Sequence, residues 1–311
     1  MNELTMWQKI KTNLSFRGPD GIRAGWSIAI FFAVLAAILG VFAAFRYFVL
    51  IKLFHLQLVF HGEIPPQAML FGEMVQTAFI LGATYVMARI EGRSLWDYGL
   101  ASRRTAAHFC AGWVGGFLCL SILAAVLVAS GHLVFDGIAL HGLATFGFGV
   151  LWLFIFMLVG FSEENMLRGY LLSTLAKGIG FWPAAAVTSL LFSAGHLGNP
   201  GENGFGIATV FLAGMIFCLL LRVSGSLWLG IGFHVAWDWA QSFLYGTPDS
   251  AILVKFHYLI SHATGNAHLS GGAAGPEGSY LLLPVLVPGL LVLIALWRRM
   301  GLFTKDTMTA S

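Results

Sequence analysis

Residues 160–168 read Gly160-Phe161-Ser162-Glu163-Glu164-Asn165-Met166-Leu167-Arg168 and lie inside an apolar run from about 146 to 174. A run of this length can cross the hydrocarbon core of a bilayer, because a spanning helix takes about 20 residues. Ionisable groups at membrane depth are costly, so they face a protein interior or a wet cavity and pair with other groups there. The stretch therefore predicts a membrane helix that carries a buried polar site.

The composition of the whole chain agrees with this prediction. Hydrophobic residues make up 58% of the 311 residues and charged residues only 10%, whereas a soluble domain carries about 25% charged residues. The net charge of +3 is small and the basic residues form no single patch, which argues against a nucleic-acid partner. We expect an integral, multi-pass protein of the plasma membrane, with the lipid bilayer as its surroundings.

Eight apolar segments are candidates for membrane helices, at about 26–45, 68–88, 108–130, 146–174, 182–198, 204–222, 226–245 and 280–297. With the N-terminus in the cytoplasm, only Arg46, Lys52 and Lys255 of the 17 Lys and Arg residues fall outside, and Arg168 lies within a helix. This asymmetry follows the positive-inside rule and places both termini in the cytoplasm. The predicted fold is an all-α polytopic membrane protein of about eight transmembrane helices, with the cavity inside the helical bundle.

The acids of the fourth helix differ in their partners. Glu164 and Arg168 are four residues apart, so they share one helix face and can form an ion pair. Glu163 is rotated by about 100° from that face and stays available for proton transfer. The alternative is that both acids only neutralise Arg168. A further acid, Glu73 in the second helix, could face the same cavity or cap a neighbouring backbone group, and it is assigned no role.

Two more polar motifs occur in later helices. Phe192 and His196 are four residues apart in the fifth helix, as are His234 and Asp238 in the seventh. A structural alternative for His196 is a histidine that only packs against its neighbours. The structural alternative for His234 and Asp238 is a polar pair that bridges two helices. This second pair could also bind a metal or stabilise an anion. The four candidate catalytic residues are Glu163, His196, His234 and Asp238. At 1.5 Å per residue, they lie about 12–21 Å from the cytoplasmic ends of their helices. They can therefore share one level inside the bilayer.

The order and context of these motifs resemble the CPBP intramembrane proteases, which include type II CAAX prenyl endopeptidases and bacteriocin-processing and immunity proteins. The family pattern of Glu-Glu-x-x-x-Arg, Phe-x-x-x-His and His-x-x-x-Asn or Asp appears here as Glu163-Glu164-x-x-x-Arg168, Phe192-x-x-x-His196 and His234-x-x-x-Asp238. The resemblance covers about residues 146–245. It implies an eight-helix fold with the catalytic residues in a membrane cavity.

The resemblance also implies a role for each motif. Glu163 and His196 would activate a water for attack on a peptide bond. The substrate would be a membrane-associated protein or peptide, such as a prenylated protein or a bacteriocin- or pheromone-like peptide. His234 and Asp238 would stabilise the oxyanion or orient the substrate. The site would be supported by Glu164, Arg168 and Phe192.

Asp238 departs from the common family pattern, because many members have Asn there and an ionised carboxylate cannot donate a hydrogen bond to an oxyanion. Three roles stay open for it: a protonated acid in a site of low dielectric constant, a residue that orients His234, or a metal ligand. The use of a metal also stays open at this level. The candidate ligands for Zn²⁺ are Glu163, His196, His234 and Asp238. The chain has no His-Glu-x-x-His motif, and a glutamate can activate water without an ion, so the sequence fixes no cofactor.

Two other functions remain as alternatives. A proton-coupled transporter also uses buried acids and bases, although the sequence shows no inverted repeat. A non-catalytic immunity or scaffold protein could keep the motifs for folding. In the protease interpretation, the chain divides into a cytoplasmic segment (1–25), three N-terminal helices (26–145), a catalytic core (146–245), an external loop (246–279) and a last helix with a cytoplasmic tail (280–311).

Overall fold

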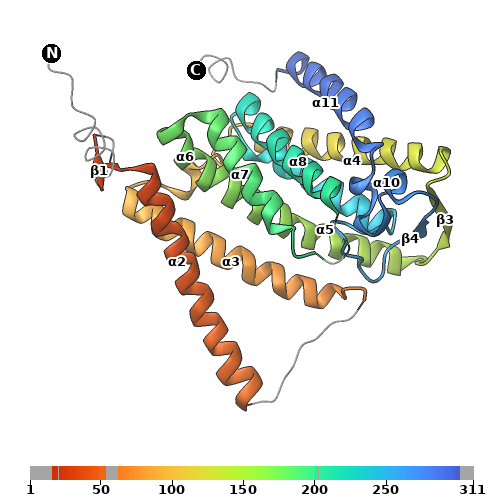
Figure 1. The fold of residues 1–311 in the computed structure, drawn as a ribbon, viewed down its shortest axis with the longest axis horizontal. Helices are drawn as coiled ribbons and strands as arrows, with labels where there is room; N and C mark the ends of the chain where they lie inside the picture. The colour runs from red at the N-terminus through yellow and green to blue at the C-terminus, as the bar shows by residue number, and fades with distance from the viewer. Residues whose placement is uncertain (1–15, 20, 54–61, 200, 202, 302–311) are drawn as a thin grey trace.

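The computed structural model describes residues 16–19, 21–53, 62–199, 201 and 203–301. Most of the predicted cytoplasmic N-terminal segment and the C-terminal tail from 302 onward lie outside the described residues. The helices are α2 (Ala24–Phe45), α3 (Pro66–Glu91), α4 (Thr105–Ala129), α5 (Leu143–Glu164), α6 (Leu172–Ile179), α7 (Phe181–Gly195), α8 (Gly204–Ser224), α9 (Leu227–Asp238), α10 (Ala267–Ser270) and α11 (Leu282–Arg299) (Figure 1). The predicted all-α polytopic membrane fold is confirmed.

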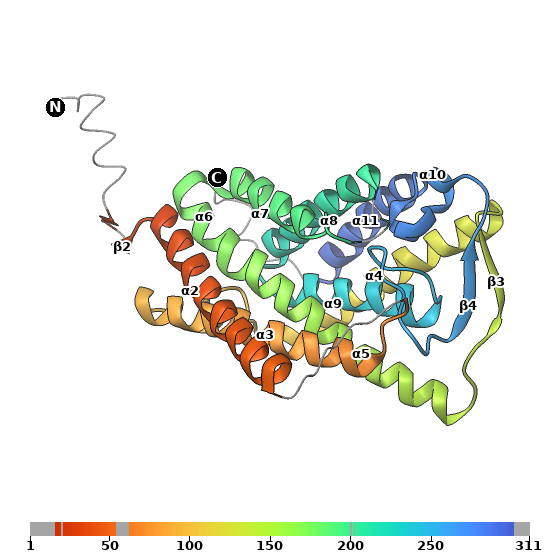
Figure 2. The ribbon, with the colours of Figure 1, turned by 60° about the horizontal axis from the view of Figure 1, so that its bottom comes forward.

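Each of the eight apolar segments expected from the sequence is helical. In the described part of the chain, six helices are long and apolar enough to cross a membrane, and one of them runs without a break from Leu143 to Ile179. The other two segments are α7, which has 15 residues, and α9, which continues as the π-helix η4 (Trp239–Leu244). Figure 2 shows α9 inside the bundle, and it contacts α4, α5 and α8.

Glycines bring α4 and α9 into close backbone contact. A Cβ atom at Gly112 or Gly116 of α4 would lie 2.1 Å from a carbonyl oxygen of α9. In the same way, a Cβ atom at Gly232 would lie 2.1 Å from the carbonyl oxygen of Phe109. Small residues allow this approach in membrane bundles, where packing rather than the hydrophobic effect joins the helices. The contact fixes the position of α9, which carries the third polar motif.

Two π-helical segments follow polar residues of the predicted site. The segment η3 (Asn165–Leu171) begins directly after Glu164, between α5 and α6, and η4 begins directly after Asp238. A π-turn inserts an extra residue into the helix, and such insertions are frequent at functional sites. They change which side chains face the interior beyond each motif.

The segment predicted as an external loop carries structure of its own. It contains β4 (Leu259–Ala263), α10, and the 3₁₀ turns η5 (Gly272–Ala274) and η6 (Pro276–Gly278). β4 pairs antiparallel with β3 (Leu133–Ile138), which links α4 to α5 (Figure 2). The remaining described elements are the strands β1 (Arg17–Gly18) and β2 (Gly21–Ile22), the π-helix η1 (Arg46–Leu53) and the 3₁₀ turn η2 (Leu95–Asp97).

Candidate active site

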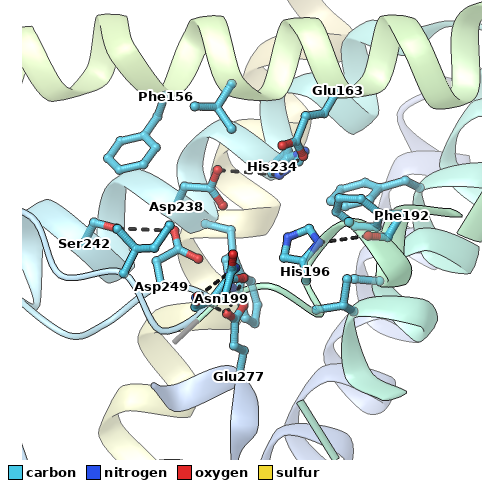
Figure 3. Close-up of a pocket in the computed structure, with 18 of the residues that line it drawn as sticks. Phe156, Glu163, Phe192, His196, Asn199, His234, Asp238, Ser242, Asp249 and Glu277 are labelled. Atoms are coloured by element: carbon cyan, nitrogen blue, oxygen red, sulfur yellow. Dashed lines mark hydrogen bonds and ion pairs between the residues drawn. The ribbon is translucent and has the colours of Figure 1, made fainter. Parts of the chain in front are cut away.

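A cavity of about 340 Å³ lies within the bundle and contains every residue that the sequence placed in the reaction. Its apolar residues come mainly from α3, α5, α8 and α11, and its polar residues from α3, α5, the turn after α7, α8, α9, η4 and the segment after η4 (Figure 3). The polar residues that line it are Glu73, Gln76, Glu163, His196, Asn199, Thr209, His234, Asp238, Ser242, Asp249, Ser250 and Glu277. The three polar motifs, which are distant in the chain, therefore meet at one site.

Glu164 and Arg168 form the ion pair expected from their spacing. The Nη1 atom of Arg168 donates to Oε1 of Glu164 at 2.9 Å, and both side chains are fully buried. The guanidinium also lies over the rings of Phe192 and Phe217, at 4.5 and 5.0 Å from their centroids. Neither charged group lines the cavity. The pair instead contacts residues that do, such as Phe192 and His234.

His234 contacts three carboxylates. Its Nδ1 atom lies 3.2 Å from Oε1 of Glu164, and because an ionised carboxylate only accepts, Nδ1–H is the donor. Its Nε2 atom lies 3.5 Å from Asp238 and 3.8 Å from Glu163. The ring stacks on Phe217 at 4.8 Å between centroids. These contacts hold the imidazole in one orientation, with Nε2 toward the cavity.

His196 presents its other nitrogen to the cavity. Its Nδ1 atom lies 2.9 Å from the carbonyl oxygen of Phe192, which can only accept, so Nδ1–H donates. In the neutral ring this leaves Nε2 as an acceptor, and Figure 3 shows the ring turned into the cavity. No hydrogen bond or ion pair joins His196 to Glu163, both of which the structure describes. The two groups face a shared space, and the carboxylate of Glu163 lies 3.8 Å from Nε2 of His234.

Several residues of the site could not be found by motif. Phe217 of α8 contacts both Arg168 and His234, but a phenylalanine in an apolar helix carries no signal. Asp249 lies in the cavity wall, where Ser242 donates to it at 3.3 Å. Burial, with Asp238 nearby, raises the pKa of Asp249 well above its ordinary value. The only indication in the sequence was that Asp249 follows closely after the helix that carries His234 and Asp238.

The donor atoms do not fit a metal ion. Among the described residues, no group of three or more His, Cys, Asp or Glu side chains is arranged to hold one. Nε2 is the nitrogen that each of His196 and His234 presents to the cavity, and Nε2 of His196 makes no ion pair with a carboxylate of the described residues. The reaction below is therefore built only from side chains and water.

A comparison with protein families bears on this site. Residues 145–240 match the family model described as type II CAAX prenyl endopeptidase, Rce1-like. The matched segment runs from α5 to η4 and includes Glu163, His196, His234 and Asp238. No curated protein matches the chain. The match covers the segment on which the sequence resemblance rests.

Proposed function

We propose that the protein hydrolyses a peptide bond of a membrane-associated substrate, because residues 145–240 match the family model of the Rce1-like type II CAAX prenyl endopeptidases. One observation carries the proposal: Glu163, His196 and the His234–Asp238 pair face a single cavity inside the bundle. The cavity volume of about 340 Å³ lies within the range of about 300–1,000 Å³ that is usual for binding sites.

In the proposed reaction, Glu163 is the general base. It takes a proton from a water molecule while the water oxygen bonds to the scissile carbonyl carbon. Nε2 of His196 accepts the second hydrogen of that water and so orients it. When the tetrahedral intermediate collapses, the C–N bond breaks and Glu163 returns its proton to the leaving amine. Proton transfer by a positioned side chain contributes about 10²–10⁴-fold in rate.

We assign the oxyanion to His234 rather than to Asp238. With Nδ1–H donated to Glu164, Nε2 is the nitrogen that faces the cavity, and it donates to the oxyanion when it carries a proton. Asp238, at 3.5 Å from Nε2, holds that proton in place before the substrate arrives. Asp238 is therefore a positioning residue, as are Glu164, Arg168 and Phe192, which fix the rings.

The substrate class and membrane placement are also proposals. The family domain supports a protein or peptide held at the membrane, such as a prenylated protein or a bacteriocin- or pheromone-like peptide. The distribution of Lys and Arg supports both termini in the cytoplasm, and the plasma membrane is part of the same proposal.

Glu163→Gln is the decisive variant. The protein and its variants are reconstituted in liposomes with a prenylated, membrane-tethered peptide, and turnover is followed by mass spectrometry. We expect Glu163→Gln to lose about 10²-fold or more in turnover. Glu73→Gln, which changes another acid of the cavity wall, should keep wild-type turnover.

Mass spectrometry of membrane peptides, from cells that express the wild type or Glu163→Gln, identifies the natural substrate. Peptides that accumulate only with active Glu163 support the proposal. Wild-type turnover by a folded Glu163→Gln protein refutes the assigned base.

A further inference from the structure

A chain of hydrogen bonds runs from His196 along the wall of the catalytic cavity to Glu277. His196 is the first residue after α7, and the backbone N–H of Asn199 donates to its carbonyl oxygen at 3.1 Å. The side-chain Nδ2 of Asn199 donates to the carbonyl oxygen of Ser250 at 2.9 Å. The backbone N–H and the hydroxyl group of Ser250 both donate to Oε1 of Glu277, the hydroxyl at 2.8 Å. Figure 3 shows Asn199 between His196 and Asp249, with Glu277 beside it.

Glu277 is held in place at the far end of this chain. Its backbone carbonyl accepts a hydrogen bond of 3.0 Å from Oγ1 of Thr209, a buried residue of α8. Since α8 is a 21-residue helix that packs on α7 and α9, it gives the chain a rigid support. The residues Asn199, Thr209, Ser250 and Glu277 all line the catalytic cavity, and the proposed reaction uses none of them.

Ser250 and Ala251 hold the backbone in a conformation that their side chains disfavour. They are the central residues of a two-residue turn, in which Asp249 and Ile252 exchange backbone hydrogen bonds of 2.8 and 2.9 Å. The φ angles of the central pair are 45° and 65°. Such a turn normally carries Asn-Gly or another pair with glycine, because these residues adopt a positive φ readily. A pair without glycine persists in this conformation only when its surroundings hold it there.

The contacts of the turn supply this support. Glu277 accepts from both donors of Ser250, and the N–H of Ala251 donates to the carbonyl oxygen of Ala274 at 3.1 Å. The carbonyl group that Asn199 contacts belongs to the peptide unit between the two strained residues. Its direction therefore depends on their backbone angles, and a relaxed turn would rotate it away from Asn199.

The segment that carries His196 is held from both sides. Ser193, three residues before it, donates to a carbonyl oxygen of α8 at 2.7 Å, and Asn199, three residues after it, donates to the strained turn. Between them, Leu197 is 67% exposed and Gly198 is also exposed. The backbone position of His196 therefore depends on the contact of Asn199 as well as on α7.

We propose that Asn199 and Glu277 are positioning residues for His196 and that they act through the strained turn at Ser250. The inference rests on the proposed function, in which Nε2 of His196 orients the attacking water. Glu277 fixes the turn, the turn fixes the carbonyl group of Ser250, and Asn199 carries this position to the backbone of His196. A misplacement of about 1 Å caused by a distant change can cost about 10²-fold in rate, so loss of either contact should lower kcat.

The kinetic test uses the full-length chain in liposomes with the prenylated, membrane-tethered peptide. We expect Asn199→Ala and Glu277→Ala each to lower kcat by about tenfold and to leave KM within about twofold. Glu277→Gln keeps an oxygen that accepts from both donors of Ser250, so it should keep the wild-type kcat. This comparison separates the hydrogen bonds of Glu277 from its charge.

Two further variants make the kinetic test specific to the turn. Ala251→Gly adopts the positive φ without strain, so adding it to Glu277→Ala should recover most of the lost kcat. Asn266→Ala removes another asparagine of the same external segment, one that caps α10 outside the cavity, and should behave as the wild type does. A loss of kcat in Glu277→Gln equal to that in Glu277→Ala, or an effect on KM alone, would overturn the proposal.

Hydrogen–deuterium exchange of the same variants gives a readout that does not depend on turnover. We expect faster amide exchange at residues 196–199 in Asn199→Ala and Glu277→Ala, and wild-type exchange there in Glu277→Gln. Exchange in α4 should stay as in the wild type and serves as the control for folding. Unchanged exchange at 196–199 in both alanine variants would reject the positioning role. If Glu163→Gln loses turnover while Asn199→Ala and Glu277→Ala keep it, the proposed function stands and this inference fails.

Discussion

Arg168→Met tests whether the buried ion pair holds the catalytic helices together. Removing one partner of a buried pair leaves an uncompensated charge and costs about 3–5 kcal/mol of unfolding free energy. Glu164 would keep one partner, His234 at 3.2 Å, which favours the lower end of that range. The lost contacts with the rings of Phe192 and Phe217 add about 0.5–2 kcal/mol. We expect a total loss of about 4 kcal/mol.

The measurement is unfolding by SDS in mixed micelles, followed by tryptophan fluorescence. Glu164→Gln/Arg168→Met leaves no unpaired charge, so it should recover a large part of the lost stability. Arg89→Met, at an exposed position of α3, should change stability by less than about 0.5 kcal/mol. A loss below about 1 kcal/mol for Arg168→Met, or a double variant no more stable than Arg168→Met, would refute the reasoning.

Two further variants test the packing of α9 and the charge of the cavity. In Gly116→Ala the new Cβ would lie 2.1 Å from the carbonyl oxygen of Phe233, so we expect a loss of about 1–3 kcal/mol and of turnover. Gly147→Ala on α5 meets no atom within 4 Å and should be neutral or stabilising, and equal effects of the two changes would contradict the clash. Burial raises the pKa of Asp249 in the folded state above its ordinary 3.8, so wild-type stability falls as the pH rises past that value. Asp249→Asn should therefore gain stability over the wild type with rising pH, whereas a pH-independent difference would argue against a buried acid.

Local features of the sequence predicted the parts of this fold that depend on helix geometry alone. Hydropathy located all eight helical segments, and six helices of the described chain are long enough to cross an apolar core of fixed thickness. The spacing of Glu164 and Arg168 predicted their ion pair, because residues four apart meet on one helix face. These inferences need no knowledge of how the helices pack.

Contacts between helices could not be predicted in the same way. The sequence paired Glu163 with His196 and did not foresee that the structure brings Glu163 within 3.8 Å of Nε2 of His234. Membrane helices in a bundle are apolar on every side, so hydropathy does not tell which face turns inward. The π-segments after Glu164 and Asp238 further change the register beyond each motif, and no residue pattern marks a π-turn.

The segment after η4 shows the same limit for loops. Its Gly-rich composition indicated an external loop, and its secondary structure of short turns and one strand is consistent with low regularity. Yet Ser250 and Glu277, 27 positions apart, bond to each other and both line the cavity. The contact between Ser250 and Glu277 depends on tertiary structure. The sequence therefore indicated a loop but not that this loop lines the cavity.

The position of α9 explains how an aspartate at position 238, in place of asparagine, can serve the proposed reaction. An asparagine there could donate directly to an oxyanion, whereas an aspartate can only accept unless it is protonated. Asp238 lies one helical turn from His234, with 3.5 Å between its Oδ2 atom and Nε2. The close contact between α4 and α9 holds this turn in place, so in the proposed reaction the proton needed by the oxyanion stays on His234. With asparagine at position 238, the side chain at 238 could donate to the oxyanion. With Asp238, the donor is the imidazole of His234, which lies on the same helix.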